Sequence, residues 1–132
     1  MVLKYGTGNR WGSNKTPLGL HRIVSKIGRN ASKGTIFRRR RNTGKIARGR
    51  REGDLITTRI LRLAGLEKGR NKGKGKDSFQ RCIYIHGTSE DNLVGKPVSH
   101  GCIRMKNRDI IELFDLVKRG SLVWINSAGM RK

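Results

Sequence analysis

The apolar residues of this chain come in short runs separated by glycine-rich stretches, and this pattern limits what the chain can fold into. Eighteen of the 132 residues are glycine and only two are proline. Because glycine fits the tight turns that join strands, the composition favours short strands over long helices. The length suits one domain with a modest core. We therefore expect a single, mainly β domain over residues 1–132.

Several segments are expected to form strands and one to form a helix. Residues 1–37 are predicted to contain two strand-like pieces around a tight turn at 16–19. The piece at 20–28 has a spacing that fits either a short helix or a bent strand, and a strand is favoured. Further strands are predicted at 55–66, 79–86 and 121–126. The helix is predicted to start with Asn107 as its N-cap and to end at Gly120, with Lys118 and Arg119 in its last turn. Its apolar stripe consists of Ile110, Ile111, Leu113, Phe114 and Val117.

Positive charge is concentrated in the first two thirds of the chain. The formal net charge is +22, and residues 1–81 contribute +19 of it. Two basic segments, 38–51 and 67–78, have no apolar periodicity and are predicted to be flexible, solvated loops. Such a field attracts polyanions, but charge alone does not select nucleic acid, acidic lipid or an anionic wall polymer. Aromatic residues are nearly absent from both loops, which argues against a platform for stacking bases.

Residues that could carry chemistry are concentrated between positions 86 and 104. A thiol is a useful nucleophile only as thiolate, so Cys102 needs a neighbouring base. Both His100, two residues away, and His86, at the end of a buried strand, are candidates. Gly101 permits a sharp turn beside the thiol, where backbone N–H groups can face a developing oxyanion. Arg104 is suited to a bidentate grip on a substrate carboxylate.

Geometry favours His86 as the base. If the segment around Cys102 is extended, residues two apart have Cα atoms roughly 6.5 Å apart and point the same way, which aims the His100 ring poorly at the sulfur. The ring of His86 can instead be held rigidly at the end of its strand. Its second nitrogen can then donate to the carbonyl of Gly87 and fix the tautomer that a general base needs.

Other roles for the cysteines and histidines are weaker. Cys82 lies in an apolar strand and is predicted to be a small buried hydrophobe. A zinc site from Cys82, His86, His100 and Cys102 has suitable ligand types, but its spacing matches no common pattern. A disulfide between the two cysteines would consume the nucleophile. We expect no metal site.

His86-Gly87-Thr88, followed after a loop by Ser-His-Gly-Cys-Ile-Arg-Met at 99–105, resembles the signature of the L,D-transpeptidase (YkuD-like) catalytic domain. The resemblance extends upstream through residues 16–21 and 56–61, and downstream through Asn107, the helix and residues 123–125. It therefore covers most of the chain.

The resemblance implies a β-sandwich-like fold and an acyltransferase without a cofactor that acts on the tetrapeptide stems of peptidoglycan. Cys102 would attack the bond between the third and fourth stem residues and form a thioester, which an amine acceptor resolves. The remaining roles are carried over residue by residue: His86 as base, the Gly87 carbonyl as its orienting partner, Ser99 and His100 as pocket residues, and the amides near Gly101 and Cys102 as oxyanion hole. Carbapenems would acylate the same thiol.

The start of the chain departs from the family pattern. About fifteen residues precede Thr16, where the family domain usually opens with strands, so these first strands are expected to be reduced or missing. Those residues contain no apolar signal region of the kind that directs export. The resemblance, by contrast, implies a protein that is exported to the cell envelope. We therefore expect either a cytoplasmic protein or part of a longer exported one.

A rival hypothesis belongs to another class of protein: a basic nucleic-acid-binding or ribosome-associated protein with structural cysteines and histidines. Charge alone would not place His-Gly and Ser-His-Gly-Cys at this separation. The signature therefore favours the enzyme.

Overall fold

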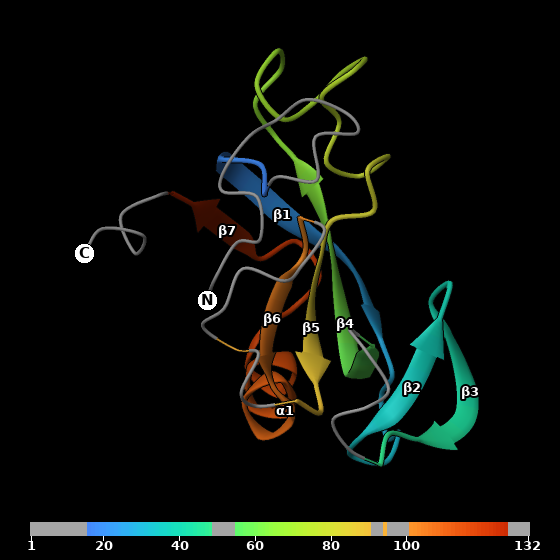
Figure 1. The fold of residues 1–132 in the computed structure, drawn as a ribbon. Helices are drawn as coiled ribbons and strands as arrows, with labels where there is room; N and C mark the ends of the chain where they lie inside the picture. The colour runs from blue at the N-terminus through green and yellow to red at the C-terminus, as the bar shows by residue number, and fades with distance from the viewer. Residues whose placement is uncertain (1–15, 49–54, 91–93, 95–100, 127–132) are drawn as a thin grey trace.

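The computed structural model describes residues 16–48, 55–90, 94 and 101–126 (Figure 1). The elements follow in the order β1 (Gly19–Ile27), β2 (Thr35–Arg38), β3 (Arg41–Ile46), β4 (Ile56–Gly65), β5 (Tyr84–Thr88), β6 (Ile103–Lys106), α1 (Asn107–Leu116) and β7 (Leu122–Ile125). The fold is mainly β with one helix, as the sequence predicts. No helix in the described ranges is long and apolar enough to cross a membrane. The expectation about missing first strands concerns residues 1–15, which lie outside the described residues.

Strand β4 is the centre of a seven-stranded sheet. Its residues 60–62 pair with β1 on one edge and with β5 on the other, both antiparallel. Strand β2 pairs with residues 56 and 57 on the same edge as β1, and β7 and β3 extend the sheet outward from β1 and β2. Strand β6 pairs in parallel with β5, and this pairing positions the candidate site.

The two faces of the sheet bury different apolar clusters. Helix α1 contacts β4, β5 and β6 (Figure 1). Its buried residues Ile110 and Phe114 belong to the larger core, with Ile23, Leu61, Leu63, Ile83, Ile85, Ile103 and Ile125. A smaller cluster contains Phe37, Ile60 and Tyr84, with Cys82 and Cys102 packed against it. Because strand neighbours alternate between faces, Ile60 and Tyr84 point away from the side of Leu61 and Ile85.

The strand predicted at 79–86 starts later than expected. Residues 79–82 form turns, in which the Cys82 N–H donates to the Phe79 carbonyl at 3.1 Å. Cys82 itself has φ +57°, in the left-handed region, which ends any extended segment before β5. The strands predicted at 20–28 and 55–66 are present as β1 and β4.

The prediction of a loop over 38–51 is wrong at Arg38, which ends strand β2, and over 41–46, which form strand β3. Strands β2 and β3 make a hairpin whose two central residues, Arg39 and Arg40, have φ values of +50° and +65°. A two-residue turn of this kind normally uses asparagine and glycine, so two arginines at these positions are no signal for a turn. Five of the six residues of β3 are exposed, so water solvates their charged side chains while the backbone of β3 pairs with β2. Residues 49–51 fall outside the described residues, and 67–78 form turns with one isolated bridge.

Asn107 does not cap the helix as predicted. The N-cap is Lys106, and no side chain caps the helix there. The Asn107 side chain is used instead to link α1 to the sheet: its oxygen accepts from the hydroxyls of Thr57 and Thr58 at 2.7 and 2.5 Å, and its amide donates to Ser89 Oγ at 3.0 Å. The helix ends at Leu116, so Lys118 and Arg119 follow it and are not in its last turn.

Candidate active site

The parallel pairing of β5 with β6 brings the two parts of the sequence motif together. His86 lies opposite Arg104, and Ile85 opposite Ile103. Cys102 directly precedes β6, and the Tyr84 N–H donates to its sulfur at 3.3 Å, so Cys102 lies opposite Tyr84. His86 is two residues along β5 on the same face. The strand rise and spacing then put the Cα atoms of His86 and Cys102 roughly 8 Å apart, a separation that an imidazole and a thiol together can bridge.

The imidazole of His86 is held in one orientation. The residue is 4% exposed, and its Nδ1 lies 2.8 Å from the carbonyl oxygen of Gly87. A carbonyl can only accept, so Nδ1 carries the hydrogen and Nε2 is the atom that can accept a proton. A Cβ on Gly87 would lie 2.6 Å from Thr57 O and 2.7 Å from Asn107 Oδ1, so this position requires glycine.

The thiol of Cys102 sits between two backbone groups. It donates to the carbonyl oxygen of Cys82 at 3.3 Å while the Tyr84 N–H donates to the sulfur. A donor aimed at sulfur binds a thiolate more tightly than a thiol. The preceding residue, Gly101, has φ +107°, a conformation that favours glycine. The nucleophile candidate therefore follows a sharp turn and enters a rigid strand. No disulfide joins the two cysteines.

Two arginines contribute positive charge in this region: Arg81 near the Cys102 thiol, and Arg40 near the Tyr84 hydroxyl and Cys82. Burial lowers the pKa of Arg81, and attraction to Cys102 acts in the opposite direction, so this guanidinium lies close enough to stabilise a thiolate. Arg40, at the tip of the β2–β3 hairpin, donates to the Tyr84 hydroxyl at 2.8 Å, and this bond raises the pKa of Arg40. Burial raises the pKa of Tyr84, with the Arg40 hydrogen bond opposing the change.

Other predicted site residues differ in how much can be said of them. Arg104 is 2% exposed and lies beside His86, which favours a role in holding the base in place. Its predicted contact with a substrate carboxylate stays a prediction. Ser99 and His100 lie outside the described residues. Within the described ranges, no three His, Cys, Asp or Glu side chains are grouped so that they could hold a metal ion.

Comparison with known proteins assigns the chain to a family. The model of the YkuD family, described as the L,D-transpeptidase catalytic domain, matches residues 1–125. The chain belongs to this family. The transpeptidase motif residues His86 and Cys102 are thus both inside the matched range.

Curated relatives match shorter segments. Bacillus subtilis (strain 168) YkuD is 55% identical over 42 residues, which are 32% of this chain and 26% of that protein. Bacillus subtilis YqjB is 46% identical over 52 residues, 39% of this chain and 28% of the relative. Escherichia coli (strain K12) YbiS is 46% identical over 43 residues, which are 33% of this chain and 14% of that protein. All three names contain the term L,D-transpeptidase, and the matched segments span between 14% and 28% of these proteins.

Sequence reasoning missed two residues that this L,D-transpeptidase family member brings to the site. Tyr84 is two residues before His86, so strand alternation puts both side chains on one face, and that signal was available. Arg40 had no such signal. Its contact with Tyr84 depends on the unforeseen β2–β3 hairpin, which places Arg40 in the turn between the two strands, 2.8 Å from the Tyr84 hydroxyl.

Proposed function

We propose that this chain is an L,D-transpeptidase that acts on the tetrapeptide stems of peptidoglycan through a thioester on Cys102, with His86 as general base. The hydrogen bond from His86 Nδ1 to the Gly87 carbonyl carries the proposal, because it leaves Nε2 as the proton acceptor beside β6, the strand that Cys102 directly precedes. The membership of the chain in the L,D-transpeptidase family supports the reaction class.

In the first half-reaction, His86 Nε2 takes the proton of the Cys102 thiol, and the sulfur attacks the carbonyl carbon between the third and fourth stem residues. Backbone amides near Gly101 and Cys102 would stabilise the oxyanion of the tetrahedral intermediate. On collapse, the C–N bond breaks and the imidazolium gives its proton to the departing amine of the fourth residue. The product is a thioester on Cys102.

In the second half-reaction, an acceptor amine attacks the thioester carbon, and His86 removes the amine proton. The C–S bond breaks, and the proton returns to the sulfur. Burial of His86 and its fixed tautomer suit both steps, because the same nitrogen accepts and donates. Ser99 and His100 are proposed to shape the pocket for the stem. A peptidoglycan substrate implies that the enzyme works in the cell envelope.

Intact-mass analysis after exposure to a carbapenem tests this function. We expect one covalent adduct per chain, absent in Cys102→Ser and retained in Cys82→Ser. Peptide mapping should place the adduct on Cys102. A chain that forms no adduct, or one that is modified on Cys82, would contradict the proposal.

A further inference from the structure

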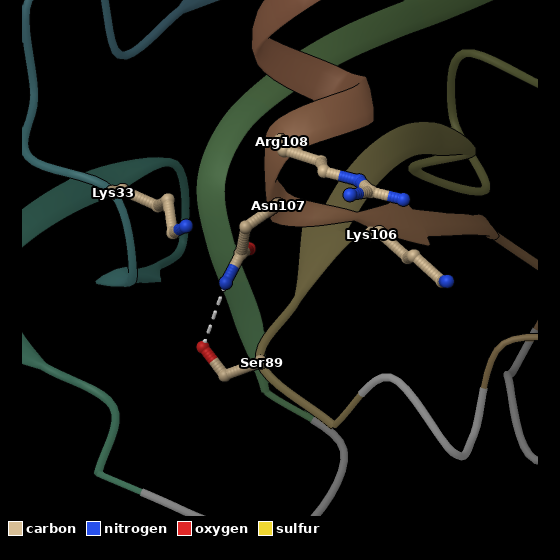
Figure 2. A pocket seen from close by; sticks show the side chains of 5 residues that line it. All are labelled: Lys33, Ser89, Lys106, Asn107 and Arg108. Atoms are coloured by element: carbon tan, nitrogen blue, oxygen red, sulfur yellow. Dashed lines mark hydrogen bonds between the residues drawn. The ribbon is translucent and has the colours of Figure 1, made fainter.

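A second candidate site lies where β5 and β6 end and α1 begins (Figure 2). A pocket of about 380 Å³ is lined there by Lys33, Ser89, Lys106, Asn107 and Arg108. Three of these side chains are cations, the other two are uncharged and polar, and none is a carboxylate. Lys106 lies opposite Thr88 in the pairing of β6 with β5, two residues beyond His86. The pocket is therefore next to the candidate active site but does not contain it.

The three cations come from three different parts of the chain. Lys33 is in the turn before β2, Lys106 ends β6, and Arg108 is in the first turn of α1. Arg108 Nε lies 3.6 Å from Asp109 Oδ1, but these side chains are 75% and 52% exposed, so water screens the pair and an incoming anion can compete for the guanidinium. Among the described residues, no carboxylate forms an ion pair with Lys33 or Lys106.

The uncharged residues also favour an anion. The Asn107 oxygen accepts from Thr57 and Thr58, so it is directed toward the sheet. Its amide nitrogen is the end that points toward Ser89 and the pocket (Figure 2). The pocket thus presents ammonium, guanidinium, amide and hydroxyl donors together. Such donors match an oxyanion with several acceptor oxygens.

The positive surface continues from the pocket into the β2–β3 hairpin. Residues 29–48 contain eight lysines and arginines and no aspartate or glutamate. Gly34, next to Lys33, lies close to both Ile46 and Ser89, so the base of the hairpin borders the pocket. The segment's single aromatic residue, Phe37, is 4% exposed and cannot stack on a base.

We propose that this pocket binds a phosphate group of a phosphodiester polymer that has no bases, and that the β2–β3 hairpin binds further phosphates along it. Three cations around one pocket, next to a basic hairpin, suit a polymer of phosphodiesters better than a single carboxylate, because each phosphate along the polymer brings its own negative charge and two acceptor oxygens. The lack of an exposed aromatic residue within 29–48 leaves this surface without a platform on which bases could stack. Assigning the polymer to the bacterial wall rests on the proposed function. The phosphate site itself rests only on the residues described.

The test measures binding of poly(glycerol phosphate) and of inorganic phosphate to the full chain. The double variant Lys33→Gln/Lys106→Gln is compared with Lys68→Gln/Lys74→Gln, which removes the same charge from exposed positions of the 67–78 segment. We expect the pocket variant to lose at least about tenfold in polymer affinity and the control less than about threefold. Affinity of the unmodified chain should fall steeply with salt.

Equal losses in the two double variants would overturn the proposal, because binding would then follow net charge and not the pocket. Tighter binding of a DNA duplex than of the base-free polymer would overturn the choice of ligand. Carbapenem acylation of Cys102 is measured on the same samples and should be unchanged in the pocket variant. Loss of acylation in every sample with phosphate binding intact would refute the proposed function alone.

Discussion

Asn107→Ala is expected to destabilise the domain by about 2–4 kcal/mol. The amide is a bridge between α1, β4 and the end of β5, and it packs on Gly87, whose carbonyl orients the candidate base. Removing it leaves two neighbouring threonines on β4 without the acceptor that they share. The magnitude follows from how completely those two hydroxyls are buried.

Thr57 and Thr58 are both 0% exposed, and their hydroxyls donate to Asn107 Oδ1 at 2.7 and 2.5 Å. A typical internal hydrogen bond contributes about 1 kcal/mol net, and a buried donor left without an acceptor costs about 1–3 kcal/mol. The third bond, to the half-buried Ser89, contributes less. Water that enters the space of the missing amide recovers part of the loss, which gives the lower end of the range.

Urea unfolding followed by circular dichroism measures the change. A loss of this size should shift the midpoint by about 1–2 M, since a domain of this length has a slope of about 2 kcal/mol per M. Asn107→Asp is the matched control, because a carboxylate keeps an acceptor for both threonines and should retain most of the stability. A loss of less than about 0.5 kcal/mol in Asn107→Ala would refute this reasoning.

Three further predictions concern titration and thiol reactivity. Burial lowers the pKa of His21, so the unfolded chain, with a histidine pKa of about 6.5, takes up protons first as the pH falls. The free energy of unfolding should therefore decrease below about pH 7, and less so in His21→Gln, as measured by urea midpoints. Arg40→Gln should raise the pKa of Tyr84 further, because the guanidinium bond favours the phenolate; ultraviolet titration with Tyr84→Phe as reference checks this, and an unchanged titration would contradict the contact. Brief iodoacetamide treatment at neutral pH should label Cys102 well before Cys82, and peptide mapping that finds the reverse order would remove Cys102 as the nucleophile.

Much of the fold follows from apolar spacing in the sequence. The stripe of α1 predicted the buried residues Ile110 and Phe114, and the β-branched segment at 55–66 predicted the central strand β4. Both elements bury a continuous apolar face. The positions on that face are apolar, so their regular spacing can be recognised in the sequence. Likewise, the hydrogen bond from His86 to the Gly87 carbonyl is present as expected, while the role of His86 as base stays a prediction.

Elements that do not depend on burial could not be predicted in this way. Strand β3 lies at the edge of the sheet with mostly exposed residues, so it needs no apolar alternation, and its turn uses Arg39 and Arg40 at positive φ. Asn107 has the residue type of an N-cap, but its side-chain oxygen accepts from buried threonines on β4 and caps no helix N–H group. Those partners are fifty residues away in the sequence, so no local pattern indicates them.

The acylation rate of Cys102 by a carbapenem, measured against pH in His86→Ala and His100→Ala, tests the central claim most directly. The account predicts that His86→Ala lowers the rate by at least about a hundredfold and changes its dependence on pH. His100→Ala should weaken binding of the reagent and keep the wild-type pH profile. If His86→Ala keeps that profile and His100→Ala loses it, the base is His100, and the mechanism proposed for this site is wrong.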